Sequence, residues 1–202
     1  MVRTHGCAHA SAALVIVFTA LNRWRRPRVL KLVPPGQATP REVMVEMLSL
    51  LDDNGFQALA GLASPEALRA TLDTPELARW TGKPLLFAVG HHYPRLKELH
   101  LRIGDGDASR QRLRQLRELL ERINAGTLRV TAHPVRDASD VQRLYVQLNA
   151  ISRQLRRAGF DERLIIFDAT GGTKPYSMAA AMATLHNDIS LQYVETQGTH
   201  WR

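Results

Sequence analysis

The chain has 202 residues, which is enough for one domain of ordinary size together with an appendage. Hydrophobic residues make up 45% of it, which excludes global disorder, and a single cysteine, Cys7, excludes an internal disulfide framework. Lysine and arginine outnumber aspartate and glutamate by 27 to 19. This balance favours an anionic partner, such as a nucleotide, a nucleic acid or the inner face of a membrane.

The first predicted element is a segment without charged side chains, residues 4–22, THGCAHASAALVIVFTALN. As a helix it would be about 28 Å long, close to the roughly 30 Å hydrocarbon core of a bilayer. The basic cluster RWRRPR follows at once, a pattern that predicts a transmembrane helix with the rest of the chain in the cytoplasm. The β-branched run in residues 13–21 is also typical of a buried strand. The segment alone therefore leaves two alternatives open, a membrane helix or a core strand.

The region that follows the basic cluster is expected to be a linker with short helices. Residues 34–40, PPGQATP, indicate a turn or linker. The spacing of Val43, Met47, Leu50 and Leu51 predicts a helix over residues 41–56. Two stretches that open with Ser-Pro or Thr-Pro predict further helices over residues 64–72 and 74–82.

From residue 84 onward, apolar runs alternate with amphipathic stretches. This order predicts a Rossmann-like three-layer α/β domain with a parallel sheet. We therefore divide the chain into a transmembrane helix (4–22), a basic juxtamembrane and helical linker region (23–83) and an α/β domain (84–202). The predicted strands are residues 84–90, 127–135, 163–169 and 189–196, and the predicted helices are 108–123, 137–160 and 175–187.

A glycine loop, DATGGTK, joins the predicted strand 163–169 to the helix that follows it. Gly171 and Gly172 allow the backbone to come close to a ligand, and their N–H groups can point at an oxyanion together with those of the helix start. Thr170 and Thr173 add hydroxyl groups, and Lys174 adds a positive charge. We expect Asp168 to orient the loop or to accept a hydrogen bond from a sugar hydroxyl or a base amine. The loop has neither the Walker A spacing nor the G-x-G-x-x-G pattern.

The run formed by Asp168, Thr170, Gly171, Gly172, Thr173 and Lys174, followed by a helix of small residues, resembles the CARF domain, the CRISPR-associated Rossmann-fold sensor. The resemblance covers residues 84–202 and implies a homodimer that binds cyclic oligoadenylate across its two-fold axis. It also implies a second contact region after an earlier strand. We expect that region in AVGHHYP, which makes Gly90, His91 and His92 candidate ligand-binding residues.

Together with the N-terminal segment, the resemblance extends to small membrane effectors of type III CRISPR defence. It implies a single-pass protein of the bacterial inner membrane that binds cyclic oligoadenylate through a cytoplasmic sensor, with cyclic tetra-adenylate as the ligand that the resemblance favours. The chain would form a homodimer or homotetramer, and an oligomer of at least four chains would open a pore and depolarise the membrane, because one helix per chain cannot enclose a pore. The alternatives are a ring nuclease that cleaves cyclic oligoadenylate and a soluble sensor.

The remaining patterns in the sequence do not indicate further chemistry. His5, Cys7 and His9 are weak evidence for a metal site, and we expect neither a bound metal nor a cofactor. The arginines of residues 110–122 lack interleaved aromatic residues, so we expect no direct binding of DNA or RNA. The partners that the sequence predicts are the cyclic nucleotide, the lipid of the inner membrane and further copies of the chain.

Overall fold

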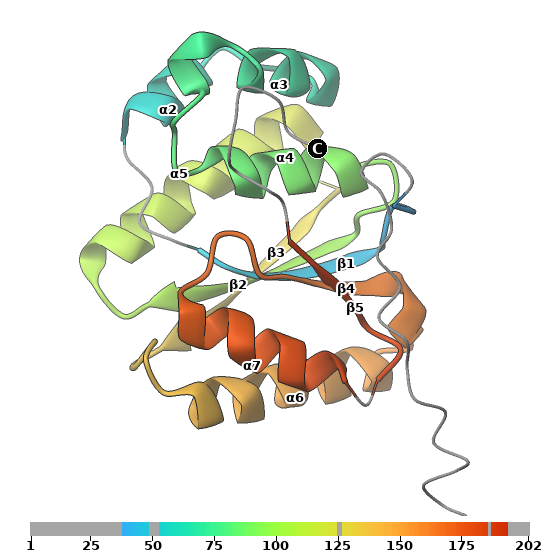
Figure 1. Ribbon diagram of the computed structural model, residues 1–202. Helices are drawn as coiled ribbons and strands as arrows, with labels where there is room; N and C mark the ends of the chain where they lie inside the picture. The colour runs from blue at the N-terminus through green and yellow to red at the C-terminus, as the bar shows by residue number, and fades with distance from the viewer. Residues whose placement is uncertain (1–37, 49–52, 125–126, 186, 194–202) are drawn as a thin grey trace, which may run out of the picture. The chain divides into compact units, whose positions relative to one another are not determined.

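The computed structural model describes residues 38–48, 53–124, 127–185 and 187–193, all of which belong to one compact unit. Its centre is a five-stranded, all-parallel sheet with the strand order β3-β2-β1-β4-β5 (Figure 1). This arrangement confirms the predicted Rossmann-like α/β fold. The strands are β1 (Val43–Met47), β2 (Glu98–Gly104), β3 (Arg129–Val135), β4 (Ile165–Asp168) and β5 (Ser190–Gln192).

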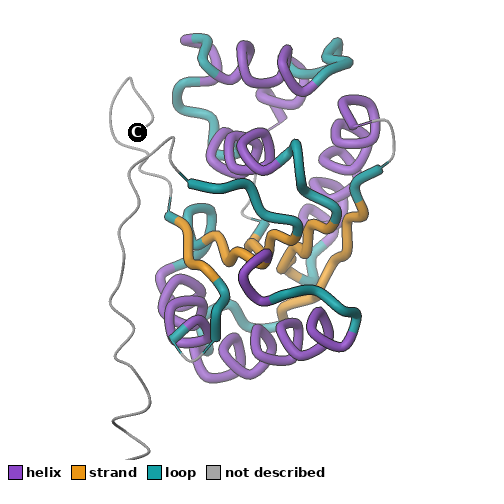
Figure 2. Tube along the Cα trace, turned by 90° about the vertical axis from the view of Figure 1, so that its right-hand side faces the viewer, coloured by secondary structure: helices purple, strands orange, loops and turns teal. Residues whose placement is uncertain are grey.

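Helices cover both faces of the sheet, as Figure 2 shows. One face carries α2 (Asp53–Ala58), α3 (Pro65–Leu72), the 3-10 turn η1 (Pro75–Leu77), α4 (Lys83–His92) and α5 (Asp107–Asn124). The other face carries α6 (Val141–Arg157) and α7 (Lys174–Thr184). The short 3-10 turn η2 (Glu162–Leu164) leads into β4.

Strand β1 lies at the centre of the sheet, where a helix was predicted over residues 41–56. All five of its residues are buried, and Val45 pairs with His100 of β2 on one side and with Phe167 of β4 on the other. Its side chains alternate between the two cores, with Val43 on one face and Met44 on the other. A strand that is buried on both faces is largely apolar, as β1 is apart from Glu46. Val43 and Met47 therefore match the spacing of apolar residues in a helix although both lie in a strand.

Helix α4 occupies residues 84–90, where a strand was predicted. It is a helix buried on most sides: Leu85, Leu86, Ala88 and Val89 are all no more than 3% exposed. A short, uniformly apolar run has no periodicity that separates a buried helix from a buried strand. Strand β2 was missed because Glu98, His100 and Arg102 interrupt its apolar pattern.

The central strand β1 lies before residue 84, so the sheet uses residues that the sequence assigned to the linker region 23–83. Among the described residues, the other predicted helices and strands are confirmed, apart from residues 74–82, which form only the short turn η1. Asp140 caps α6 by accepting a hydrogen bond from the N–H of Arg143 at 2.9 Å.

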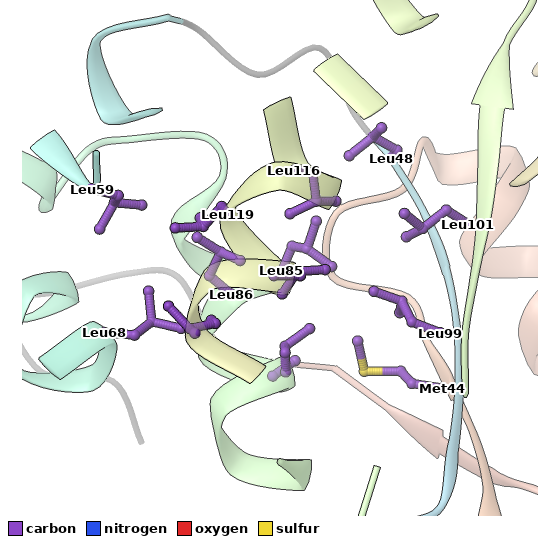
Figure 3. Close-up of a cluster of buried hydrophobic side chains, with 14 of the residues drawn as sticks. Met44, Leu48, Leu59, Leu68, Leu85, Leu86, Leu99, Leu101, Leu116 and Leu119 are labelled. Atoms are coloured by element: carbon purple, nitrogen blue, oxygen red, sulfur yellow. The ribbon is translucent and has the colours of Figure 1, made fainter. Parts of the chain in front are cut away.

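Two hydrophobic cores hold the layers together. The larger one joins β1 and β2 to α3, α4 and α5, and Figure 3 shows its leucines with Met44 at the sheet. The smaller one packs α6 and α7 against the opposite face, where Phe167 and Tyr176 are fully buried. Both helical layers are thereby fixed relative to the ends of the strands.

The predicted transmembrane helix, residues 4–22, and the basic cluster after it lie outside the described residues. Among the helices that the structure describes, none combines the length and apolarity needed to cross a bilayer.

Candidate functional site

The loop after β4 lies where open α/β sheets bind ligands. From β1 the strand order runs to β2 and β3 on one side, and then to β4 and β5 on the other. The direction of winding therefore reverses between β1 and β4, and the crevice at the carboxyl ends of two such strands is the usual binding place. Residues 169–173 and the first turn of α7 follow the carboxyl end of β4 directly.

The glycine loop presents four consecutive backbone N–H groups that have no hydrogen-bond partner within the described part of the chain. They belong to Gly171, Gly172, Thr173 and Lys174. The loop is anchored at its end, because Thr173 caps α7 by accepting from the N–H of Tyr176 and donates its hydroxyl to the carbonyl of Ala138. Lys174 is exposed at the first position of α7. Free N–H groups, a helix N-terminus and an ammonium group are the features with which proteins commonly bind oxyanions, and we name residues 171–174 the anion cradle.

Both glycines are required because the loop lies directly on buried side chains. A Cβ atom on Gly171 would lie 2.7 Å from Oε1 of Glu46, and one on Gly172 would collide with the ring of Tyr176. Neither glycine has the positive φ that favours glycine; among the described glycines only Gly159 has it. The close approach of the loop to Glu46 and Tyr176, rather than a left-handed turn, therefore explains the Gly-Gly pair.

Two buried carboxyl groups lie beneath the loop. Glu46 of β1 and Asp168 of β4 are register partners, and both are 0% exposed. Neither oxygen of Glu46 has a hydrogen-bond partner among the described residues. Burial, and then the neighbouring charge of Asp168, raise the pKa of Glu46 well above its ordinary value. Both effects favour the protonated, uncharged form of Glu46 beneath the loop.

Asp168 accepts hydrogen bonds at both oxygens. Oδ1 accepts from the N–H of Thr170 at 2.7 Å, and Oδ2 accepts from Nε2 of Gln192 at 2.7 Å. Burial raises the pKa of Asp168, and these hydrogen bonds act in the opposite direction because they stabilise the carboxylate. Asp168 thus orients the loop, which is one of the two roles expected for it.

Gln192 continues this chain of hydrogen bonds to His92, at the end of α4. Nε2 of His92 lies 2.8 Å from Oε1 of Gln192, and the backbone N–H of Arg41 donates to Nδ1 of His92 at 3.1 Å. Burial lowers the pKa of His92 to about 4. His92 is therefore neutral at physiological pH, with its proton on Nε2. We name the set Arg41, His92, Gln192 and Asp168 the polar relay.

Gly90, His91 and His92 were expected in a loop after a strand, but they form the last turn of α4. Nε2 of His91 donates to the carbonyl of Ala38 at 2.9 Å, and His92 is buried in the polar relay. Of these three residues, only His92 is connected to the glycine loop, and it is connected through Gln192. The second contact region was expected after an earlier strand, and the earlier strand that lies beside β4 in the sheet is β1.

The sequence did not indicate Glu46, Gln192 or Arg41 as site residues. The lone acid in VMVEM was a usable signal, because a carboxyl group inside an apolar strand needs a reason to be there. Arg102 was also missed. It is 3% exposed near the end of β2, where it donates to Oε1 of Gln147, while its Nε has no partner among the described residues.

The described residues contain no group of three or more histidine, cysteine, aspartate or glutamate side chains placed to hold a metal ion. His5, Cys7 and His9 lie outside the described residues. In comparisons with known proteins, no protein-family model matches the chain, and no curated protein matches it significantly.

Proposed function

We propose that this chain is a sensor of cyclic oligoadenylate that binds the phosphodiesters of its ligand at the glycine loop. One observation carries the proposal: four unpartnered backbone N–H groups, from Gly171 to Lys174, at the switch point between β1 and β4. Such groups attract an oxyanion and hold it without a metal ion. Lys174 adds an exposed ammonium group at the same place, and the raised pKa of Glu46 favours the uncharged form of that carboxyl group.

The choice of a cyclic oligonucleotide over a single phosphate rests on the resemblance of Asp168–Lys174 to the CARF motif. A ring with repeated phosphates needs the same loop twice, which a two-fold homodimer supplies. The outer face of α7 supports such a dimer, because three exposed apolar side chains lie on it at i, i+4 and i+7. They are Met178, Met182 and Leu185, with exposed fractions of 58%, 45% and 56%. This surface begins one turn after the anion cradle.

We further propose that the sensor controls a membrane. The uncharged segment 4–22 and the basic cluster after it support an N-terminal single-pass helix, with the α/β domain on the cytoplasmic side of the inner membrane. Ligand binding would rearrange the helices of an oligomer, of at least four chains, into a pore. The ligand must bind the open arrangement more tightly than the closed one, because only differential affinity shifts an equilibrium.

The binding step is tested by titration calorimetry of cyclic tetra-adenylate into the intact chain in detergent. We expect Lys174→Ala to weaken binding by roughly 10-fold or more, the effect of losing one charge-assisted hydrogen bond. Lys97→Ala is the matched control, because Lys97 is also exposed but pairs with Glu42 at the opposite end of the strands. Equal affinity of the two variants, or no binding by the wild type, contradicts the proposal.

The output is tested in cells that carry a dye for membrane potential. We expect cyclic tetra-adenylate to depolarise cells that express the intact chain but not cells that express a chain lacking residues 1–22. Carbonate extraction of the membranes distinguishes this effector from a soluble sensor. Chromatography of the ligand after incubation with the purified chain distinguishes both from a ring nuclease, since only the nuclease returns linear products.

A further inference from the structure

The polar relay has one end in the glycine loop and the other at the point where the chain enters the sheet. We propose that it couples the occupancy of the anion cradle to the conformation of residues 38–41, with Gln192 and His92 as positioning residues that act through Asp168. This inference rests on the proposed function and names the route by which that site would signal.

The relay permits only one order of donors and acceptors. The backbone N–H of Arg41 can only donate, so Nδ1 of His92 must accept, and the imidazole proton lies on Nε2. Gln192 must then accept from His92 through Oε1, which leaves its NH₂ group to donate to Asp168. Asp168 in turn accepts from the N–H of Thr170, at the start of the loop. Four consecutive hydrogen bonds of 2.7 to 3.1 Å therefore have no alternative arrangement.

The far end of the relay holds the segment that leads into β1. His91 donates to the carbonyl of Ala38, and His92 accepts from the N–H of Arg41, so the last turn of α4 clamps this segment at two points. The guanidinium of Arg41 also donates to Oγ of Ser190 at 3.2 Å, in the same strand as Gln192. Residues 38–41 connect the sheet to everything that precedes it in the chain. A shift there would be passed toward the N-terminus.

Strand β5 is the part of the relay that can move most easily. It has three residues and is the edge strand of the described sheet, so few backbone hydrogen bonds hold it. An anion on the loop draws the free N–H groups toward itself and places negative charge near the carboxylate of Asp168. The hydrogen bond from Gln192 to that carboxylate is then the contact that differs between the empty and occupied states, as coupling requires.

Amide hydrogen exchange of the intact chain, with cyclic tetra-adenylate as the probe, tests the coupling. In the wild type we expect exchange to change by about 5-fold in peptides covering residues 38–42 as well as 169–174, the effect of one ordinary hydrogen bond. In Gln192→Met, which keeps the size of the side chain but cannot hydrogen-bond, only the loop peptide should respond. Ser190→Ala is the matched control; it removes a contact from β5 to Arg41 but leaves the relay intact, so both peptides should respond.

A second arm of the hydrogen-exchange experiment needs no ligand. Asp168→Asn cannot accept from Thr170 and Gln192 at once, so we expect the amide of Arg41 to exchange about 5-fold faster than in the wild type. Asp107→Asn removes an exposed carboxylate at the same, carboxyl end of the strands, and it should leave the exchange rate of the Arg41 amide unchanged. If the Arg41 amide behaves alike in these two variants, the inference is wrong whether or not the ligand binds.

The two arms separate the failure of the inference from the failure of the proposed function. If the wild type does not bind the probe, the proposed function fails, and the second arm alone decides whether the relay connects the loop to Arg41. If the wild type binds and Gln192→Met transmits the change to residues 38–42 as the wild type does, the coupling is overturned while the sensor remains.

Discussion

Glu46 and Asp168 are register partners on adjacent strands; both are fully buried, and Glu46 has no hydrogen-bond partner among the described residues. Two carboxyl groups in such a place cannot both be ionised without strong repulsion, because burial and like charge each favour the protonated form. Asp168 has hydrogen bonds that stabilise its charge, and Glu46 has none. This difference in environment assigns the proton to Glu46.

The first prediction concerns stability at neutral and alkaline pH. Because the pKa of Glu46 is raised in the folded state, the folded chain binds more protons than the unfolded chain above pH 4.5, the ordinary pKa of the group. The free energy of unfolding should therefore fall as the pH rises from there toward the raised pKa. Glu46→Gln should lose this dependence and be more stable than the wild type at pH 8, as measured by urea unfolding.

The control for this prediction is Glu66→Gln, which removes an exposed carboxylate from the first turn of α3. It should keep the pH dependence of the wild type. Parallel stability curves for the wild type and Glu46→Gln would show that Glu46 is ionised in the fold.

The second prediction concerns acid. The pKa of His92 is lowered from 6.5 to about 4, so the unfolded chain binds the proton more readily between these values. Stability that is present above pH 6.5 is then lost as the pH falls toward 4, by about 3 kcal/mol for a shift of this size. In His92→Gln, the amide can still accept from Arg41 and donate to Gln192 but does not titrate. Urea unfolding at pH 7 and pH 4.5 should show a smaller loss in the variant.

His133 does not obscure this comparison. Burial lowers its pKa to about 4 as well, and it destabilises the fold in acid in the same direction. It is unchanged in His92→Gln, so the difference between the two proteins isolates His92. Equal losses of stability in the two proteins would mean that the pKa of His92 is the same in the folded and the unfolded chain.

The third prediction separates the two uses of glycine. Gly172→Ala should lower the free energy of unfolding by about 1–3 kcal/mol, because its Cβ would overlap the ring of the buried Tyr176. Gly90→Ala is the control in α4, where an added Cβ meets nothing within 4 Å, and it should raise stability by up to about 1 kcal/mol through helix propensity. Chemical denaturation measures both changes, and a neutral Gly172→Ala would show that the loop does not rest on Tyr176.

The fourth prediction concerns Arg102, a buried cation with no carboxylate within ion-pair distance among the described residues. Burial lowers its pKa, which reflects the unfavourable environment of its charge. Arg102→Met alone leaves Gln147 without its donor, so we expect a loss of stability. The double variant Arg102→Met/Gln147→Met removes both polar groups and should match or exceed the wild type in thermal unfolding. A double variant that is less stable than Arg102→Met would contradict this account.

Local patterns were sufficient for much of the fold. Helices α5 and α6 are amphipathic, and their apolar residues repeat with the 3.6-residue period of a helix on a surface. The segment from β4 through the glycine loop to α7 was also predictable, because an apolar run, two glycines and a run of small residues follow one another directly. In each case the signal depends on residues close together in the chain.

The sequence by itself determined the layered α/β architecture and the contiguous glycine loop from Asp168 to Lys174. It could not distinguish β1 from α4, since both are buried on nearly all sides, and full burial removes the periodicity that separates a strand from a helix. Only the tertiary structure brought Glu46, His92 and Gln192 to the loop, from three elements far apart in the chain. The strand order that puts β1 beside β4 and β4 beside β5 decides those contacts, and no local pattern encodes strand order.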